Sequence, residues 1–210
     1  SKGRRNAILW ALLVTLLWSS SWVLIKIGLD GSLPPLTFAG LRYSLAFLML
    51  LPLVLFNAKQ RQSLATLSRA TWWRLTVLGL LLYAITQGAQ FVGLSLLPAA
   101  TLTLLLTLTP IMVALLSILH GDEAATAGQW AGTLLSMVGA GIYFFPPDLP
   151  AGQVLGLAVG ALSLVTNSVA ALMGRESNRE GRLSPLLITT VSMGSGGLLL
   201  LVVGMATQGL

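Results

Sequence analysis

The sorting of basic residues along the chain constrains its fold more than any other feature. Seven apolar runs alternate with short polar connections, and ten of the 12 Lys and Arg residues lie before the first run or in every second connection after it. These ten are Lys2, Arg4, Arg5, Lys59, Arg61, Arg69, Arg74, Arg175, Arg179 and Arg182. The intervening connections carry Asp30 and Asp148 and no basic residue. Because Lys and Arg near the ends of spanning helices stay on the cytoplasmic side, the pattern predicts a chain threaded through a bilayer with its N-terminus inside.

The composition agrees with this class. The 210 residues are 55% hydrophobic and 9% charged, with a mean hydropathy of +0.87, whereas soluble domains carry about 25% charged residues. The net charge of +6 does not indicate nucleic-acid binding, because the basic residues form no face of their own. The chain has no cysteine and one histidine, so we expect no metal site and no other cofactor. The first apolar run is too long for a signal-peptide core and should stay in the protein as a span.

The apolar runs have the length of transmembrane helices. A helix needs about 20 residues to cross the hydrocarbon core, and the seven runs cover residues 8–29, 35–56, 75–97, 99–119, 128–145, 153–174 and 185–207. They are solidly apolar and do not alternate, which favours helices over a β-barrel. The predicted fold is therefore an all-α integral membrane protein of the inner membrane, and we expect it to be a monomer.

The second part of the chain echoes the first. Pro35 opens the second run after a short connection, and Pro185 opens the seventh in the same way. Aligning these prolines places the sixth run over the first, so the repeat unit has five helices. A second copy of an odd-numbered unit is inverted in the membrane, which is typical of transporters. We therefore predict a first repeat over residues 1–147 and two helices of a second over residues 148–210, with three more spans in the natural protein, ten in all.

The first run carries a candidate substrate-binding face. Trp18, Trp22 and Lys26 are spaced i, i+4, i+8 and share one side of a helix. Two aromatic rings and a cation can line a substrate pocket. Alternatively, the tryptophans belong to the interfacial aromatic belt, and Lys26 extends outward to pair with Asp30, four residues later.

Arg42 is a charged residue about seven positions inside the second run. A charge at the centre of a spanning helix costs about 2.5–3.5 kcal/mol on insertion scales, so it usually faces an aqueous cavity or a partner. In a cavity, its planar guanidinium can hold a carboxylate or phosphate. The alternative is a structural link to carbonyl groups at the end of a span.

The third run has a polar face made by Tyr83, Gln87 and Gln90, spaced i, i+4, i+7. Amide groups in hydrocarbon need partners. They either line a wet cavity, which we favour because three polar groups exceed one packing contact, or bond to neighbouring helices.

Other positions in the runs invite a functional and a structural interpretation. Pro110 interrupts the fourth run and is either a hinge or a static kink, and Asn167 in the sixth run either reaches the cavity or does not. Ridges of small residues suit internal packing or, less readily, dimerisation; they are Gly128, Gly132, Ser136 and Gly139 in the fifth run and Gly152, Gly156 and Gly160 in the sixth. All six carboxylates fall in connections, so the spans offer no obvious proton carrier.

These motifs together resemble the EamA-type repeat of the drug/metabolite transporter superfamily. The shared features are a Trp-Ser-Ser segment followed by a lysine, a proline turn followed by an arginine, a Thr-Pro in the fourth helix, and an acidic turn before a Gly-rich fifth helix. They correspond here to Trp18–Trp22 with Lys26, Pro35 with Arg42, Thr109-Pro110, and Gly121-Asp122-Glu123. Asp122 departs from the pattern as an added residue. The resemblance covers residues 7–145 well and only two helices after them.

The resemblance implies a ten-helix transporter with two inverted repeats and both termini in the cytoplasm. It further implies a central cavity for amino acids or other amphipathic metabolites, which bacterial members commonly export. Helices eight to ten of that arrangement have no counterpart in this chain, so the cavity would be incomplete.

The competing functions are distinguishable from the sequence. A carrier working by alternating access is our prediction. A seven-span receptor or photoreceptor is the alternative, but its N-terminus would lie outside, and residues 185–207 contain no lysine for a retinal Schiff base. A membrane-embedded enzyme is disfavoured because no span carries a catalytic cluster.

The predicted orientation can be tested by labelling single cysteines introduced into this cysteine-free chain. With the N-terminus inside, a membrane-impermeant thiol reagent added to intact cells should label Asp148→Cys and leave Arg61→Cys unlabelled, because residue 61 lies on the basic, cytoplasmic side. Lysed cells, in which both positions react, provide the control. Labelling of residue 61 but not residue 148 in intact cells would overturn the orientation.

Overall fold

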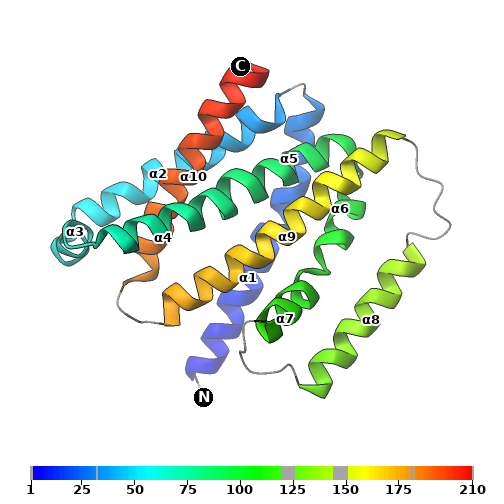
Figure 1. The fold of residues 1–210 in the computed structure, drawn as a ribbon, viewed down its shortest axis with the longest axis horizontal. Coiled ribbons are helices and arrows are strands. Elements are labelled where there is room, and N and C mark those ends of the chain that lie inside the picture. Colours follow the sequence, from blue (N-terminus) through cyan, green and yellow to red (C-terminus); the bar gives the residue numbers. More distant parts are fainter. Residues whose placement is uncertain are drawn as a thin grey trace.

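The computed structural model describes residues 2–31, 33–119, 126–143, 151–179, 181 and 183–209. These residues form helices and contain no strand (Figure 1). The helices are α1 Lys2–Asp30, α2 Pro35–Leu55, α3 Ala58–Ala65, α4 Arg69–Gly79, η1 Leu80–Thr86, α5 Gln87–Leu96, α6 Ala99–Leu106, α7 Thr109–Leu119, α8 Ala127–Tyr143, α9 Ala151–Arg179 and α10 Pro185–Gln208.

The predicted all-α, multi-span class is confirmed. Within the described ranges, six segments are long and apolar enough to cross a membrane: Ile8–Asp30, Pro35–Leu55, Arg69–Leu96, Ala99–Leu119, Gln153–Arg179 and Pro185–Gln208. The fifth predicted span corresponds to α8, which has 17 residues. That length rises about 25 Å, somewhat less than the ~30 Å hydrocarbon core. The seventh span therefore stays a prediction.

The third span changes helix type at its centre. It begins as α4, continues as the π-helix η1 and ends as α5. A π-helix has a wider turn and is frequent at functional sites. The backbones of α4 and α10 nearly touch at this point: a Cβ added to Gly79 would collide with the Ser192 carbonyl, and one added to Gly196 would collide with the Gly79 carbonyl. Only glycine permits this approach.

The helices α2 and α10 form a close antiparallel pair. At one end the Thr37 hydroxyl donates to the Gly209 carbonyl at 2.7 Å, and the Leu36 amide donates to the side-chain oxygen of Gln208 at 2.8 Å. Midway, a Cβ at Gly40 would run into the backbone of Leu201. Small residues that bring helix backbones together give the dispersion contacts that drive helix association in lipid.

Two buried apolar clusters lie at opposite ends of the bundle. The cluster at the Asp30 end, which we name the outer cluster after the predicted orientation, contains Ile25, Leu29, Ala39, Phe91, Leu94, Leu97, Leu102 and Leu200. The inner cluster, on the basic side, contains Val54, Leu75, Leu78, Ala170, Leu187, Ile188 and Val191. Between them, near the centres of their helices, lie polar residues that we call the mid-depth layer: Ser21, Arg42, Tyr43, Ser44, Tyr83, Thr86, Ser163 and Thr166.

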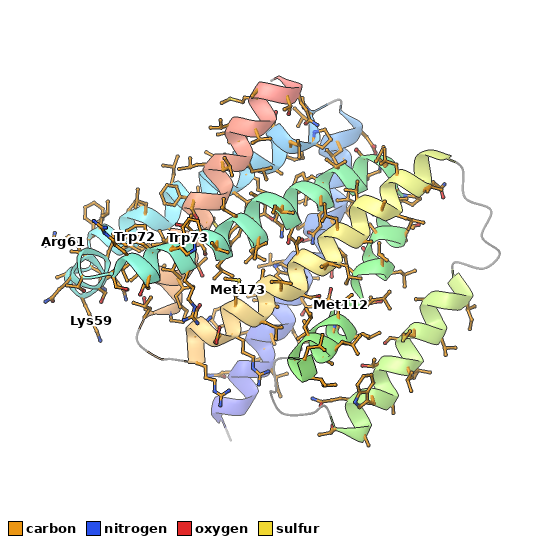
Figure 2. The ribbon with its side chains drawn as sticks, in the orientation of Figure 1. Lys59, Arg61, Trp72, Trp73, Met112 and Met173 are labelled. Carbon is orange, nitrogen blue, oxygen red and sulfur yellow. The ribbon has the colours of Figure 1, made fainter. Side chains whose placement is uncertain are left out.

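The short helix α3 covers the basic end of the bundle. Asn57 caps it by accepting from the backbone amides of Lys59 and Gln60, and the Gln60 side chain accepts a hydrogen bond from the Ser184 hydroxyl at the start of α10. Figure 2 shows Lys59 and Arg61 on α3 at the same edge of the molecule as Trp72 and Trp73 of α4. Cations and exposed indoles are the side chains expected at a membrane–water interface.

The small-residue ridges behave differently on α8 and α9. On α9, added Cβ atoms would meet neighbouring side chains, Leu97 at Gly156 and Leu105 at Gly160, so internal packing is confirmed there. On α8, a Cβ at Gly132 or Gly139 would meet nothing within 4 Å. The prediction of internal packing is wrong for α8, which lies beyond α7 at the edge of the bundle (Figure 1).

The close crossing at Gly196 predicts a sharp difference between two Gly→Ala changes. Gly196→Ala should lower the stability of the fold by about 1–3 kcal/mol, because the added methyl overpacks the contact with Gly79. Gly139→Ala on α8 should leave stability unchanged or slightly raised, because alanine favours helix and the position is open. The measurement is the thermal midpoint of the detergent-solubilised protein. Equal midpoints for both variants would contradict the close crossing.

Candidate functional site

A chain of polar contacts crosses the mid-depth layer between α1, α2 and η1. The Arg42 guanidinium donates to the Ser21 hydroxyl at 2.9 Å, and its Cζ lies 5.6 Å from the centroid of the Tyr43 ring. The Tyr43 and Tyr83 rings are 5.3 Å apart between centroids and tilted by 55°. Three helices thus contribute to one group of side chains, which we call the Arg42 cluster: Ser21, Arg42, Tyr43 and Tyr83.

The Arg42 cluster has the chemistry to bind an oxyanion. A guanidinium has five N–H donors in a fixed fork, and its contact with Ser21 uses one of its nitrogens. The half-buried side chain therefore keeps donors for a carboxylate or phosphate. The two tyrosines add aromatic faces and hydroxyl groups beside it.

The two tryptophans predicted to share this site lie in different surroundings. Trp22 is half-buried and packs against the outer cluster. Trp18, one turn earlier on α1, is 72% exposed. Trp22 therefore packs within the bundle, whereas Trp18 lies on its surface. The substrate-binding role of Trp18 rests on the sequence alone.

Lys26 ties α1 to the end of α5. Its Nζ donates to the Leu94 carbonyl at 2.9 Å and lies 3.5 Å from the Asp30 carboxylate. In a continuous helix the amide of residue 98 would bond this carbonyl, but residue 98 is proline and has no N–H. Lys26 thus supplies the missing donor. The alternative predicted for this residue, pairing with Asp30, is confirmed, and its contact with substrate stays a prediction.

The remaining polar predictions lie on α5 and α9. Gln90 is buried at 7% exposure, and Gln87 and Asn167 are half-buried. A hydrogen bond of 2.8 Å from the Thr86 hydroxyl to the Thr166 hydroxyl joins the end of η1 to α9 beside Gln87 and Asn167. This bond places both amides near the contact of span three with α9. Their role in substrate binding stays a prediction.

Pro110 lies at a true break in the fourth span. The helix stops at Leu106 and resumes at Thr109. Pro110 cannot donate to the Leu106 carbonyl, and the Thr109 hydroxyl donates to it instead at 2.7 Å. The interruption is confirmed, whereas movement about it stays a prediction. Pro110 lies apart from the Arg42 cluster and lines a cavity between α7 and α8.

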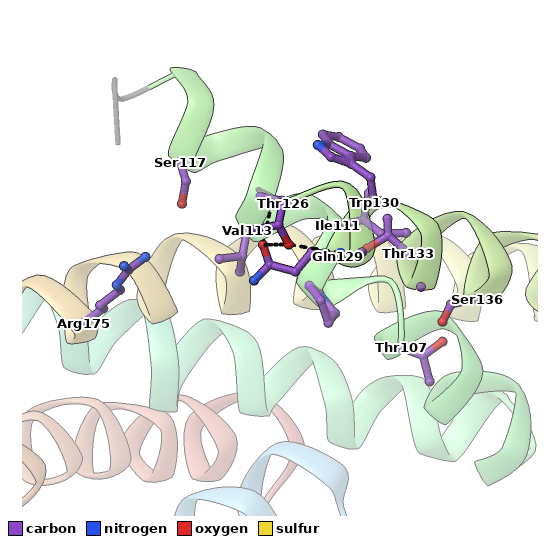
Figure 3. A pocket seen from close by; sticks show the side chains of 14 residues that line it. Thr107, Ile111, Val113, Ser117, Thr126, Gln129, Trp130, Thr133, Ser136 and Arg175 are labelled. Carbon is purple, nitrogen blue, oxygen red and sulfur yellow. Dashed lines mark hydrogen bonds between the residues drawn. The ribbon is translucent and has the colours of Figure 1, made fainter. Parts of the chain in front are cut away.

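Two cavities lie among the described residues, outside the Arg42 cluster. One, of about 610 Å³, lies between α7 and α8 and is shown in Figure 3. The other, of about 400 Å³, is an apolar groove between η1, α5, α9 and α10, lined by residues such as Ala84, Gly88 and Leu200. No group of three or more His, Asp or Glu side chains that could hold a metal occurs among the described residues.

Sequence reasoning missed several functional candidates. Tyr43 follows Arg42 directly, and Ser21 stands within the Trp18–Trp22 segment, but nothing in the spacing paired them. Gln129, Thr133 and Ser136 line the larger cavity. Their spacing of i, i+4, i+7 matches that of Tyr83, Gln87 and Gln90, so the same criterion would have found them.

Comparison with known proteins finds a matching transporter family and relatives that are named as transporters. The profile of the EamA-like transporter family matches residues 5–145. A Bacillus subtilis (strain 168) protein named uncharacterized transporter YvbV is 25% identical over 204 residues, which cover 97% of this chain and 64% of that protein. An Archaeoglobus fulgidus protein named uncharacterized transporter is 29% identical over 168 residues, covering 77% of this chain and 56% of that protein. The chain thus spans less than two thirds of these relatives. No solved structure matches it significantly.

The Lys26 contact can be tested against its neighbouring ion pair. Lys26→Met should lower stability by about 1–3 kcal/mol, because it leaves the Leu94 carbonyl without a donor in an apolar setting. Asp30→Asn should cost under about 1 kcal/mol, because the Asp30 side chain is 66% exposed and such pairs contribute little. Thermal midpoints of the two variants in detergent check this. A larger loss for Asp30→Asn would show that the ion pair, and not the carbonyl contact, holds α1.

Proposed function

Because this chain belongs to the EamA-like transporter family, we propose that it moves small metabolites across the membrane by alternating access. The substrates we propose are amino acids and related amphipathic compounds, carried by export or facilitated exchange. The receptor alternative is not favoured, since the matched family and both named relatives are transporters.

The observation that carries the substrate class is the position of the Arg42 guanidinium at mid-depth. Among the residues that the structure describes, its partners are a hydroxyl and an aromatic ring, and neither carries a formal charge. A charge in hydrocarbon normally pairs with an opposite charge or faces water. A substrate carboxylate would supply that opposite charge, and the rings of Tyr43, Tyr83 and Trp22 would contact the apolar part of an amphipathic molecule.

The two apolar clusters support alternating access. They lie on either side of the mid-depth layer. A carrier must close each end in turn, and packed apolar side chains exclude water without holding polar groups. We propose that the outer and inner clusters separate alternately around Arg42, with the break at Pro110 as a hinge. Gln87, Gln90 and Asn167 would line the path.

The inverted repeat remains part of this proposal. Under the predicted alignment of Pro35 with Pro185, α2 and α10 are equivalent helices, and an inverted pair should run antiparallel. The contacts of Thr37 with Gly209 at one end, and the shared cluster of Val54 and Leu187 at the other, are those of an antiparallel pair. This antiparallel pair agrees with the repeat. We propose the division at about residue 147, the cytoplasmic N-terminus in the inner membrane and the ten spans of the whole protein from the sequence pattern.

We propose that transport needs no proton coupling in these spans. Asp30 and Glu176 are the carboxylates of the described helices, and both are largely exposed at helix ends. A proton carrier would be expected within the membrane.

The proposed substrate contact predicts a selective effect of Arg42→Gln. Transport of carboxylate-bearing amino acids should fall about tenfold or more, since hydrogen bonds to charged groups contribute about 1.5–3 kcal/mol. Transport of the corresponding amino-acid amides should change little. Uptake into proteoliposomes, with and without a proton gradient, measures both.

Arg61→Gln, at an exposed position on α3, is the matched control and should leave both substrates unaffected. Equal losses for acids and amides in Arg42→Gln would show that Arg42 is structural. A strict requirement for the proton gradient would overturn the uncoupled mechanism.

A further inference from the structure

The cavity between α7 and α8 has the dimensions of a binding site. Its volume of about 610 Å³ lies within the ~300–1,000 Å³ typical of small-molecule sites. Figure 3 shows Arg175 of α9 at one end and Thr107 and Ser136 at the other. None of its lining residues belongs to the Arg42 cluster, so it is a separate site.

One face of α8 is built for this cavity. Thr126, Gln129, Thr133 and Ser136 all line it, at spacings that place them along one side of a helix. Residues from the other side are apolar and exposed, as expected of a face toward lipid: Leu135 at 74%, Val138 at 59% and Ile142 at 72%. The polar side chains of α8 thus gather on the side of the cavity, where Thr133 is half-buried and Thr126, Gln129 and Ser136 are exposed.

The start of α8 supplies donors to the cavity. The side-chain oxygen of Gln129 accepts from the Thr126 amide at 2.7 Å, and the Gln129 amide donates to the Thr126 hydroxyl at 3.4 Å. This reciprocal cap fixes the Gln129 side chain. Capping uses its oxygen, so its NH₂ group can donate elsewhere. The helix N-terminus also carries partial positive charge.

Arg175 supplies a positive charge to the described lining of the cavity. It is the charged residue among the described lining side chains. Glu176, its neighbour on α9, instead forms an ion pair of 3.5 Å with Arg74 of α4, in span three. A guanidinium at one end, with the Gln129 amide and hydroxyl groups further along the lining, favours an oxyanion as the ligand.

We propose that this cavity is a second binding site, for small water-soluble carboxylates or phosphate monoesters that enter from the side of Arg175. The depth of the polar lining argues against a lipid. From Thr126 to Ser136 the helix rises about 15 Å, half the hydrocarbon thickness. An acyl chain there would offer no hydrogen bond to the hydroxyls of Thr133 and Ser136, whereas a hydrated solute would.

Single cysteines in the cysteine-free chain test access to the site. Thr133→Cys lies in the cavity, and Leu135→Cys lies on the exposed apolar face. Two thiosulfonate reagents, one with a sulfonate and one with a trimethylammonium group, are applied to inverted and right-side-out vesicles. Residue 133 should react from the Arg175 side only and faster with the anionic reagent, and residue 135 should react with neither.

Charge variants test the role of Arg175. In the Thr133→Cys background, Arg175→Gln should lower the ratio of anionic to cationic labelling rates about threefold or more. Arg175→Lys should preserve the ratio. Arg179→Gln, one turn further along α9, is the control for general surface charge and should change it little.

Binding itself is tested by protection. Millimolar inorganic phosphate or L-glutamate should slow the labelling of residue 133. Choline chloride at equal ionic strength is the control and should not slow it. The anion that protects more strongly identifies phosphate or carboxylate as the ligand group. Any one of three outcomes would overturn the proposal. They are the absence of protection by both anions, an unchanged ratio of anionic to cationic labelling rates in Arg175→Gln, and labelling of residue 133 only by a lipid-soluble maleimide. Because labelling needs no transport, these outcomes are independent of the function proposed for Arg42.

Discussion

The close approach of α10 to two other helices is the contact on which the bundle depends. Gly196 meets the backbone of Gly79, and Gly40 admits the backbone of Leu201. In lipid, apolar side chains gain little by leaving one apolar environment for another, so helices associate through close dispersion contacts and hydrogen bonds. Glycine allows these contacts where a methyl group would prevent them. The π-helix η1 begins at the residue after Gly79, so the widened turn and the crossing occupy the same place in the third span.

Backbone groups left without partners explain two polar side chains within the spans, one of which, Lys26, was predicted to bind substrate. Pro98 and Pro110 each remove an amide donor, and a bare carbonyl in hydrocarbon costs several kcal/mol. Lys26 donates to the Leu94 carbonyl, and Thr109 donates to the Leu106 carbonyl. A polar residue in a spanning helix can therefore be present to repair the backbone, and its partners must be known before it is assigned to a substrate.

Polar and apolar side chains occupy separate layers of the bundle, an arrangement that suits a carrier of the EamA-like family. Apolar clusters occupy both ends, and Arg42, Tyr43 and Tyr83 lie between them. Binding at mid-depth is the arrangement that allows access from either side in turn. The cavity between α7 and α8 is separate from this layer and is lined by other helices, with Arg175 at one end.

The sequence by itself determined the class, the approximate spans and the order of motifs, because hydrophobic length and charge sorting act locally along the chain. It also pointed to Arg42 and Tyr83, since a charge or a polar face inside an apolar run is visible without any fold. Only the tertiary structure decided that Ser21 and Tyr43 join them, that Lys26 is bound to a carbonyl, and that Trp18 and the α8 ridge stay exposed. Helical periodicity fixes which residues share a face, but not which helix that face meets. That choice follows from close packing between segments distant in the chain, as at Gly79 and Gly196.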